Sequence, residues 1–442
     1  MTTHTFIDLF SGCGGLSLGL TLAGLQGHFA IERDPMAFRT FSANFLGQRK
    51  VPVTKFSWPS WLENRAWAID DLLTRHLVDL HQLQGKVNVL AGGPPCQGFS
   101  FAGRRQESDP RNFLFEKYVQ VVDAIKPAAL VLENVPGMKV AHFSKNDSTG
   151  SREQAPESYY DKLKKSLEAI GYLVDGKIVD ASRFGVPQKR SRLIVIGLRR
   201  SLTERLEGGI SRAFELLEKK REEHLLELGL PDSITAEEAI SDLRTDFSLR
   251  QPCKDPDSPP GFYEAVYKNP LTDFQKLMHK HARSDFMNSM RLARHSEEVR
   301  KRFELIQKEC DKGVLMNKAN RTRYGLKKHR IYPMSASSPA PTITTLPDDV
   351  LHYAEPRILT VRESARLQSF PDWFQFQGKF TTGGAARTKE CPRYTQVGNA
   401  VPPYLGRVIG MAITAVLAEA AGEAQHALDS VNVLQGQVAA VA

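Results

Sequence analysis

Cysteine is scarce in this chain. Five cysteines in 442 residues stand at positions 13, 96, 253, 310 and 391, and no two have the close spacing of a zinc site. So few and so scattered, they exclude a disulfide framework and fit a reducing, cytoplasmic setting. No metal is expected.

Long apolar runs are also missing. No stretch approaches the roughly 18 consecutive apolar residues of a membrane span, and the first residues lack the charge pattern of a signal peptide. We find no internal repeat. With 41% hydrophobic residues the chain can bury a large core, so we expect two or three domains, or one large domain with an insert, away from any membrane.

Positive charge is concentrated in one part of the chain. The net charge is +9 overall, and residues 276–330 hold 16 lysines and arginines against 6 acidic residues. Such a window favours a phosphate-binding surface over a merely solvated face. Residues 201–250 are acidic instead, and their role is left open.

The first 200 residues alternate short apolar strands with helical patterns. Strands are predicted near 5–10, 28–32, 87–91, 129–133 and 192–197, with helices near 16–23, 36–45, 113–125 and 159–170. Continuous apolar strands between helices indicate an α/β fold whose parallel sheet is covered on both faces.

The pattern changes after residue 200. A charged helical stretch, a Pro-rich loop at 251–262 and the basic window precede a return to orderly patterning. We therefore predict a domain at 1–200, a smaller inserted domain at 201–340, a return to the first domain at 341–420, and a disordered or frayed tail at 421–442.

A glycine-rich turn follows the first strand. Phe10–Gly15 would wrap a ligand closely, and Glu32 ends the next strand about 20 residues on, where a carboxylate can accept from ribose hydroxyls. The spacing differs from GxGxxG, which argues against NAD. The alternative is an ordinary turn beside a surface glutamate.

Cys96 follows two glycines and two prolines, within residues 90–100 (LAGGPPCQGFS). Glycine lets a ligand approach closely and proline stiffens the turn, so the Cys96 thiol is expected to be held in a fixed position near a ligand. A lone cysteine is more often a buried structural residue. Here Glu133, Arg190 and Arg192 also fall at predicted strand ends, where sites of this architecture are built.

Six motifs together resemble the DNA cytosine-5 methyltransferases of bacterial modification type. They occupy residues 8–15 (DLFSGCGG), 93–100 (GPPCQGFS), 133–135 (ENV), 188–192 (QKRSR), 366–371 (RLQSFP) and 396–402 (QVGNAVP). The resemblance implies a Rossmann-like, S-adenosylmethionine-dependent methyltransferase fold with an inserted target-recognition domain.

The resemblance also assigns chemistry. Cys96 would be the covalent nucleophile on carbon 6 of a cytosine flipped out of the duplex, and Glu133 would meet ring N3 and the exocyclic amine. Arg190 and Arg192 would lower the thiol pKa and hold the base carbonyl and phosphate. Substrate contacts would come from Gln97, Ser100, Arg104, Arg105 and Gln188, and residues 100–112 would form a closing loop.

S-adenosylmethionine is the implied cofactor, with S-adenosylhomocysteine as product. The residues expected around it are Phe10, Ser11, Gly12, Gly14, Gly15, Leu16, Glu32, Arg33, Pro94, Asn399, Ala400 and Val401. The family's usual aspartate for the adenine amine has no matching motif between Glu32 and Cys96, and Asp70 and Asp71 are the candidates in that interval.

The implied partner is double-stranded DNA, acted on by a monomer in the bacterial cytoplasm, at the nucleoid. Candidate phosphate contacts in the basic window are Arg283, Arg291, Arg294, Arg321, Arg323, Lys327, Lys328 and Arg330. Two alternatives stay open: an RNA cytosine-5 methyltransferase, whose Cys-Phe-Thr tripeptide is missing here, and an inactive DNA-binding homologue. The recognised bases, a preference for hemimethylated sites, and a companion restriction or mismatch-repair endonuclease are beyond the sequence.

Overall fold

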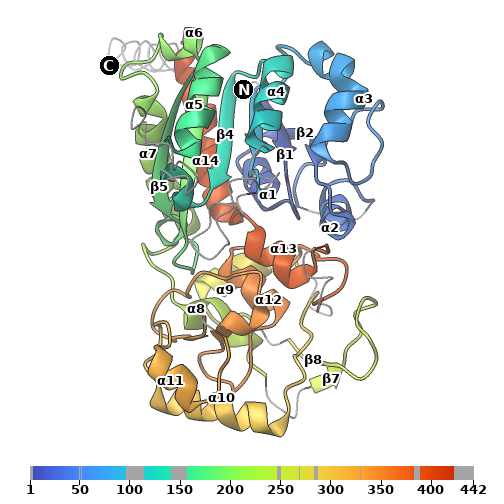
Figure 1. Ribbon diagram of the computed structural model, residues 1–442, viewed down its shortest axis with the longest axis vertical. Coiled ribbons are helices and arrows are strands. Elements are labelled where there is room, and N and C mark those ends of the chain that lie inside the picture. Colours follow the sequence, from blue (N-terminus) through green and yellow to red (C-terminus); the bar gives the residue numbers. More distant parts are fainter. Residues whose placement is uncertain are drawn as a thin grey trace, which may run out of the picture.

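A computed structural model describes residues 3–48, 50, 52–95, 114–140, 157–245, 250–267, 269–282, 287–328, 330–382 and 389–422. The described chain forms a larger lobe around a six-stranded sheet and a smaller, mainly helical lobe below it (Figure 1). The strands of the sheet are β1 (Thr5–Leu9), β2 (Gln26–Ile31), β3 (Val89–Gly92), β4 (Ala129–Asn134), β5 (Tyr172–Asp180) and β6 (Ser191–Arg199).

The sheet has the order β2-β1-β3-β4-β6-β5. The first four strands are parallel, as predicted, but β6 runs antiparallel to both β4 and β5. The expectation of a fully parallel sheet is therefore wrong for β6. The connection from β5 to β6 holds only a short 3-10 helix, Ala181–Phe184, and a parallel crossover needs a longer one. As a result β6 starts at the edge where β4 ends.

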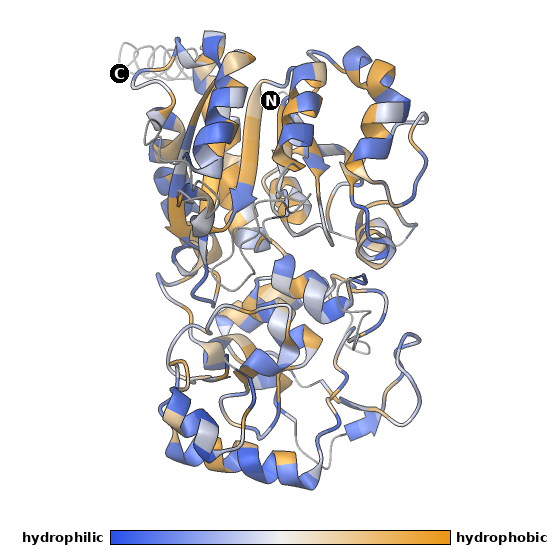
Figure 2. Cartoon of the chain, viewed as in Figure 1, coloured by the Kyte–Doolittle hydropathy of each residue, from blue (hydrophilic) through white to orange (hydrophobic). Residues whose placement is uncertain are grey.

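Helices cover both faces of the sheet. One face carries α3 (Ile69–Gln82), α4 (Leu114–Ile125) and α5 (Tyr159–Ala169) over alternate strand residues such as Leu90 and Leu132. On the opposite face lie α1 (Gly15–Leu22), α2 (Pro35–Phe45), α7 (Ser211–Leu228) and α14 (Pro403–Ala420). Figure 2 shows the hydrophobic colour concentrated on the central strands.

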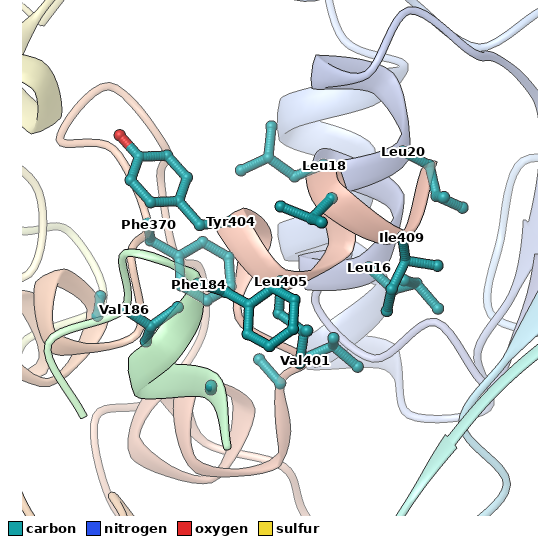
Figure 3. Packing of buried hydrophobic residues seen from close by; sticks show 14 of the residues in the cluster. Leu16, Leu18, Leu20, Phe184, Val186, Phe370, Val401, Tyr404, Leu405 and Ile409 are labelled. Carbon is teal, nitrogen blue, oxygen red and sulfur yellow. The ribbon is translucent and has the colours of Figure 1, made fainter. Parts of the chain in front are cut away.

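Helices α1 and α14 pack unusually closely. A Cβ at Gly19 would lie 2.5 Å from the backbone carbon of Gly406, so no side chain fits at this crossing. Around it, leucines of α1 meet Leu405 and Ile409 of α14, as Figure 3 shows. The helix behind the glycine-rich turn is thus fixed by a segment from the other end of the described chain.

The smaller lobe is built on short helices and arginine-centred ion pairs. Arg366, fully buried, pairs with Asp242 and Asp372, and Arg393 pairs with Asp255. The elements of this lobe are α8 (Ala236–Ile240), β7 (Arg250–Pro252), β8 (Tyr263–Ala265), α9 (Asp273–His279), α10 (Glu297–Glu309), α11 (Lys318–Arg323), β9 (Tyr332–Pro333), β10 (Val350–Leu351), α12 (Val361–Leu367) and α13 (Arg393–Asn399).

The predicted borders at residues 200 and 340 differ from the spatial division into lobes. Helix α7 packs along α14 on the larger lobe, while α12 and α13 lie in the smaller one (Figure 1). The short α6 (Arg200–Thr203) joins β6 to α7. That residues 201–340 recognise a target stays a prediction, and most of the predicted tail lies outside the described residues.

Candidate active site and cofactor loop

The glycine-rich turn forms a tight loop between β1 and α1. Phe10, Gly12 and Gly14 have φ of 60°, 56° and 95°. A Cβ on Gly14 would lie 2.5 Å from the Phe45 ring, and one on Gly15 would lie 2.3 Å from the Val401 carbonyl oxygen. The positive φ and the close approach at Gly14, and the close approach at Gly15, explain why glycine is needed at these two positions.

Glu32 closes this loop from the end of β2. Its carboxylate accepts from the Gly12 amide at 3.0 Å and from the Asp34 amide at 2.7 Å. Burial raises the pKa of Glu32, and the two amide hydrogen bonds oppose that rise. The predicted ribose acceptor therefore lies against the glycine loop, while Arg33 beside it is exposed.

Ser11 has an enclosed hydroxyl beneath the same loop. Its Oγ has no hydrogen-bond partner within the described part of the chain. A buried polar group without a partner is costly, so this hydroxyl is suited to meet a polar ligand. Leu16, next along α1, is buried in the apolar core.

Asp8 was missed by the sequence reasoning. It is fully buried on β1 and accepts from Ser17 Oγ at 2.6 Å. Desolvation raises the pKa of Asp8 to about 7, with the Ser17 hydrogen bond opposing the rise. A lone carboxylate inside an apolar strand was the available signal.

Asp8→Asn is expected to remove a pH dependence of stability. The pKa of this carboxyl is about 7 in the folded protein and 3.8 in the unfolded chain, so the folded protein holds the proton more tightly. The stability that results is fully present below pH 3.8 and is lost as the pH rises through about 7. Between pH 5 and pH 7 the free energy of unfolding of the wild type should fall by about 2 kcal/mol relative to that of the variant. Urea unfolding at both pH values measures this, with the exposed Asp71→Asn as control. An equal difference at the two pH values would contradict it.

A second cluster lies where β3 and β4 end. Glu133, buried on β4, pairs with Arg192 of β6 at 2.7 Å. A Cβ on Gly93 would lie 3.7 Å from Glu133 Oε2. Gly93 precedes Pro94 and Pro95, and the Asn134 amide holds the Pro94 carbonyl at 3.1 Å. The carboxylate therefore lies beside the turn that leads into Cys96.

Arg190 is directed elsewhere. Its guanidinium, almost completely buried, donates to the carbonyl oxygens of Ile343, Gly398 and Ala400 at 3.0–3.1 Å. It thereby joins the start of β6 to the segment before α14. No ion pair with Glu133 is found in the described structure, so Arg190 positions the site's walls in this arrangement.

Gln188 is likewise held within the protein. Its amide donates to the Leu367 carbonyl at 3.2 Å and to Gln368 at 3.0 Å, and its oxygen accepts from the Ile343 amide. Of the predicted cofactor residues near the C-terminus, Ala400 and Val401 are buried beside the loop and Asn399 is exposed. Asp70 is exposed and pairs with Lys117 at 3.0 Å.

Several predicted residues lie outside the described residues. These are Cys96, Gln97, Ser100, Arg104, Arg105 and, in the basic window, Arg283.

The basic candidates separate into two groups. Arg323 pairs with Glu309, Lys328 with Asp348 and Asp349, and Arg321 donates to backbone carbonyls; Arg330 lies 3.9 Å from Asp349. By contrast, Arg291, Arg294 and Lys327 have no carboxylate partner among the described residues. A cationic side chain that has no carboxylate partner within the protein is available to bind a DNA phosphate.

The described residues contain no group of histidine, cysteine, aspartate or glutamate side chains that could hold a metal ion. One stretch, Arg393–Ala420, is long and apolar enough to cross a membrane, yet 78% of its apolar window is buried inside the protein. It is the core segment formed by α13 and α14.

The Rossmann-like sheet with a glycine loop and an acidic residue after the second strand defines an S-adenosylmethionine-dependent methyltransferase fold, as predicted. The family described as C-5 cytosine-specific DNA methylase matches residues 4–415, so the chain belongs to that family. The predicted enzyme class, DNA (cytosine-5-)-methyltransferase, is confirmed.

Known proteins resemble the chain over most of its length. It is 30% identical to the type II methyltransferase M.DdeI of Desulfomicrobium norvegicum, over 92% of this chain and 88% of that protein. It is also 30% identical to M1.HphI of Haemophilus parahaemolyticus, over 92% and 86%. A prophage-encoded E. coli protein, described as a DNA modification methyltransferase, shares the fold with a TM-score of 0.62 at 24% identity, covering 94% of this chain and 99% of that one.

Proposed function

We propose that this enzyme methylates carbon 5 of a cytosine extruded from a specific duplex DNA sequence, through a transient bond between Cys96 and carbon 6. The observation that carries the proposal is the buried Glu133–Arg192 pair beside Gly93, three residues before the thiol. This cluster and the glycine loop lie at the same edge of the sheet, because β1, β3 and β4 are parallel and β6 begins there.

Cys96 supplies the nucleophile. Addition of its thiolate to carbon 6 places electron density on carbon 5, which is otherwise a poor nucleophile. After carbon 5 has gained a methyl group, a base removes its proton and the C6–S bond breaks, which restores the thiolate. A positive group nearby favours the thiolate form, and Arg192 brings such a charge to Glu133, which lies beside the turn that leads into Cys96.

Glu133 holds the target base. Its carboxyl, buried and oriented by Arg192, is placed to meet ring N3 and the exocyclic amine of a flipped cytosine. A proton shared with N3 would offset the charge that develops as sulfur adds. Arg190 acts indirectly, since its hydrogen bonds fix the start of β6 and hence Arg192.

S-adenosylmethionine, when bound, supplies the methyl group as an electrophilic sulfonium. The residues present fit it: Ser11 offers an unpartnered hydroxyl, the glycines leave room for close approach, and Glu32 offers a carboxylate at the end of β2. Phe10 begins this loop, and Gly93, next to Pro94, donates to the Leu9 carbonyl at 3.3 Å. Ala400 and Val401 lie against Gly15.

The proposed setting is the bacterial cytoplasm, with duplex DNA as substrate and the chain acting as a monomer. The type II names of the relatives support a place in a restriction-modification system, with a separately encoded endonuclease.

Trapping tests the proposal. Bisulfite sequencing of DNA from cells with and without the protein first gives the methylated sequence. A duplex carrying 5-fluorocytosine at that site, incubated with the enzyme and S-adenosylmethionine, should then give a denaturation-resistant adduct, because fluorine blocks removal of the carbon 5 substituent. Peptide mapping should find the adduct on Cys96.

The rival functions predict other outcomes. An RNA methyltransferase would trap the matching RNA and leave the duplex free. An inactive DNA-binding homologue would bind the duplex without any adduct. Either result would overturn the proposed function.

Arg294→Ala with Lys327→Ala is expected to weaken DNA binding and flatten its salt dependence. Both side chains are exposed and lack carboxylate partners among the described residues. Each lost phosphate contact reduces the magnitude of the slope of log K against log salt by about 0.9, so the slope of the double variant should be smaller by about 2. Filter binding between 50 and 300 mM salt, roughly the range over which such slopes are measured, gives the slope. Lys86→Ala, at the opposite edge of the sheet, is the control; an unchanged slope in the double variant would move the DNA surface elsewhere.

A further inference from the structure

Arg291 lies between two aromatic rings in the smaller lobe. Its guanidinium carbon is 4.1 Å from the centre of the Phe262 ring and 3.8 Å from that of Phe380. The residue is only 9% exposed. Contact with both rings restricts the movement of the guanidinium.

The backbone around Arg291 is fixed as well. The Ala265 amide donates to the Met290 carbonyl at 3.3 Å, and the Leu292 amide donates to the Tyr263 carbonyl at 2.8 Å. Residues 290–292 thereby add to strand β8, with Arg291 opposite Glu264. The Phe380 ring also stacks on Arg393, at 4.3 Å, and Arg393 is itself held by Asp255. The side chain is therefore pre-organised.

Arg291 differs from the other buried arginines of the lobe. Arg357, Arg362, Arg366 and Arg393 each donate to several acceptors at 2.5–3.1 Å. For Arg291 the described residues provide no hydrogen-bond acceptor and no carboxylate partner. The Glu264 carboxylate opposite it is taken by the Gln251 amide and the Lys254 backbone.

An unpaired buried cation is expensive to maintain. Desolvation lowers the pKa of Arg291, yet an arginine stays charged at neutral pH. Contact with two rings offsets only part of the cost of removing the charge from water. An apolar side chain of similar length would fill the space more favourably, so the retained charge calls for an acceptor from outside the chain.

We propose that Arg291 presents its N–H edge to a pair of acceptor atoms on the bound duplex. This inference rests on the proposed function, and it assigns one DNA-contacting residue within the smaller lobe. Guanidinium donors match two acceptors at once, either guanine O6 and N7 in the major groove or two oxygens of a phosphate. Contact with the two rings favours such binding because the guanidinium is already held in place before the DNA binds.

Arg291→Met separates this role from a structural one. Methionine keeps an unbranched apolar side chain between the rings and removes the buried charge, so thermal unfolding should occur at the same or a higher temperature. Methylation of the cognate duplex should nevertheless fall about 10- to 100-fold in kcat/KM. Arg302→Ala, on α10, partly exposed and paired with Glu298, is the matched control and should keep wild-type activity.

Two measurements distinguish the acceptors. If Arg291 reads guanine, methylation of a randomised duplex library should lose discrimination at one G·C position, with the salt slope nearly unchanged. If it holds phosphate, binding should weaken equally for all sequences, the slope should fall by about 1, and Arg291→Lys should recover most of the loss. Either outcome supports the contact.

A stable Arg291→Met enzyme with wild-type kcat/KM, site preference and salt slope would overturn the inference. If the methionine variant is less stable than wild type, the residue is structural and the inference also fails. A wild-type enzyme that methylates no DNA would instead refute the proposed function, which keeps the two failures distinct.

Discussion

Cys96→Ser is expected to abolish methyl transfer, with a fall in kcat on the order of 10³-fold or more. The hydroxyl is far less acidic than a thiol and a much weaker nucleophile toward carbon 6. Affinity for the cognate duplex should change little, because the sulfur takes part in chemistry and phosphate contacts supply most of the binding free energy. Single-turnover transfer of radiolabelled methyl groups, with the 5-fluorocytosine adduct as a second readout, measures the effect.

Cys253→Ser is the matched control for this experiment. Cys253 lies in the smaller lobe, follows β7 and has no place in the proposed chemistry. Its serine variant should retain turnover and adduct formation. Normal turnover by Cys96→Ser would refute the nucleophile, whereas loss of both turnover and DNA affinity would indicate damage to the fold.

Arg366→Ala is expected to destabilise the protein by about 3–5 kcal/mol. Arg366 donates to Asp372 at 2.6 and 3.1 Å and to Asp242 at 2.6 Å, and all three side chains are completely buried. Burial by itself would raise the pKa of Asp372, but the adjacent Arg366 holds it well below its usual range. Removing the arginine leaves the Tyr267 hydroxyl as the side-chain partner of Asp242 and His279 as that of Asp372, and neither replaces the buried guanidinium.

The pH dependence of this loss gives a second readout. In the wild type the depressed pKa of Asp372 provides stability above its unfolded pKa, and that stability is lost as pH falls through the folded value. In Arg366→Ala the two buried carboxylates take up protons more readily, so the loss of stability relative to the wild type should shrink between pH 7.5 and about 5. Urea unfolding measures both effects. Lys379 forms a solvent-accessible ion pair with Glu390, so Lys379→Ala should lower the free energy of unfolding by less than about 1 kcal/mol. An equal loss of stability in the two variants would contradict the predicted role of the buried Arg366.

The apolar pattern predicted most of the sheet because strands buried on both faces read as continuous hydrophobic runs. It missed β5, where buried and half-exposed residues alternate along Tyr172–Asp180 as expected at the edge of a sheet. It also assumed that β6 was parallel, since direction depends on the length of the preceding connection and not on the strand's own residues.

The candidate site was predictable where residues act at strand ends. Glu133 and Arg192 were each predicted at a strand end, and the structure brings them to 2.7 Å because β6 runs antiparallel to β4 and begins where β4 ends. Arg190 shows the limit of such reasoning. It is two residues from Arg192 in the chain, yet its three acceptors lie more than 150 residues away. Residues two apart in a strand point to the same face, but Arg190 stands before β6 begins at Ser191, and no local pattern identifies its long-range acceptors.

The crossing of Gly19 with Gly406 has a consequence for biosynthesis. During translation α1 leaves the ribosome early, but the surface that covers it, α14, is among the last described segments to be made. Its apolar face must stay exposed or be shielded by chaperones until α14 has been translated. Ribosome-bound nascent chains that end before Pro403 should therefore remain protease-sensitive around residues 15–22, and release of the complete polypeptide should convert them to the resistant form.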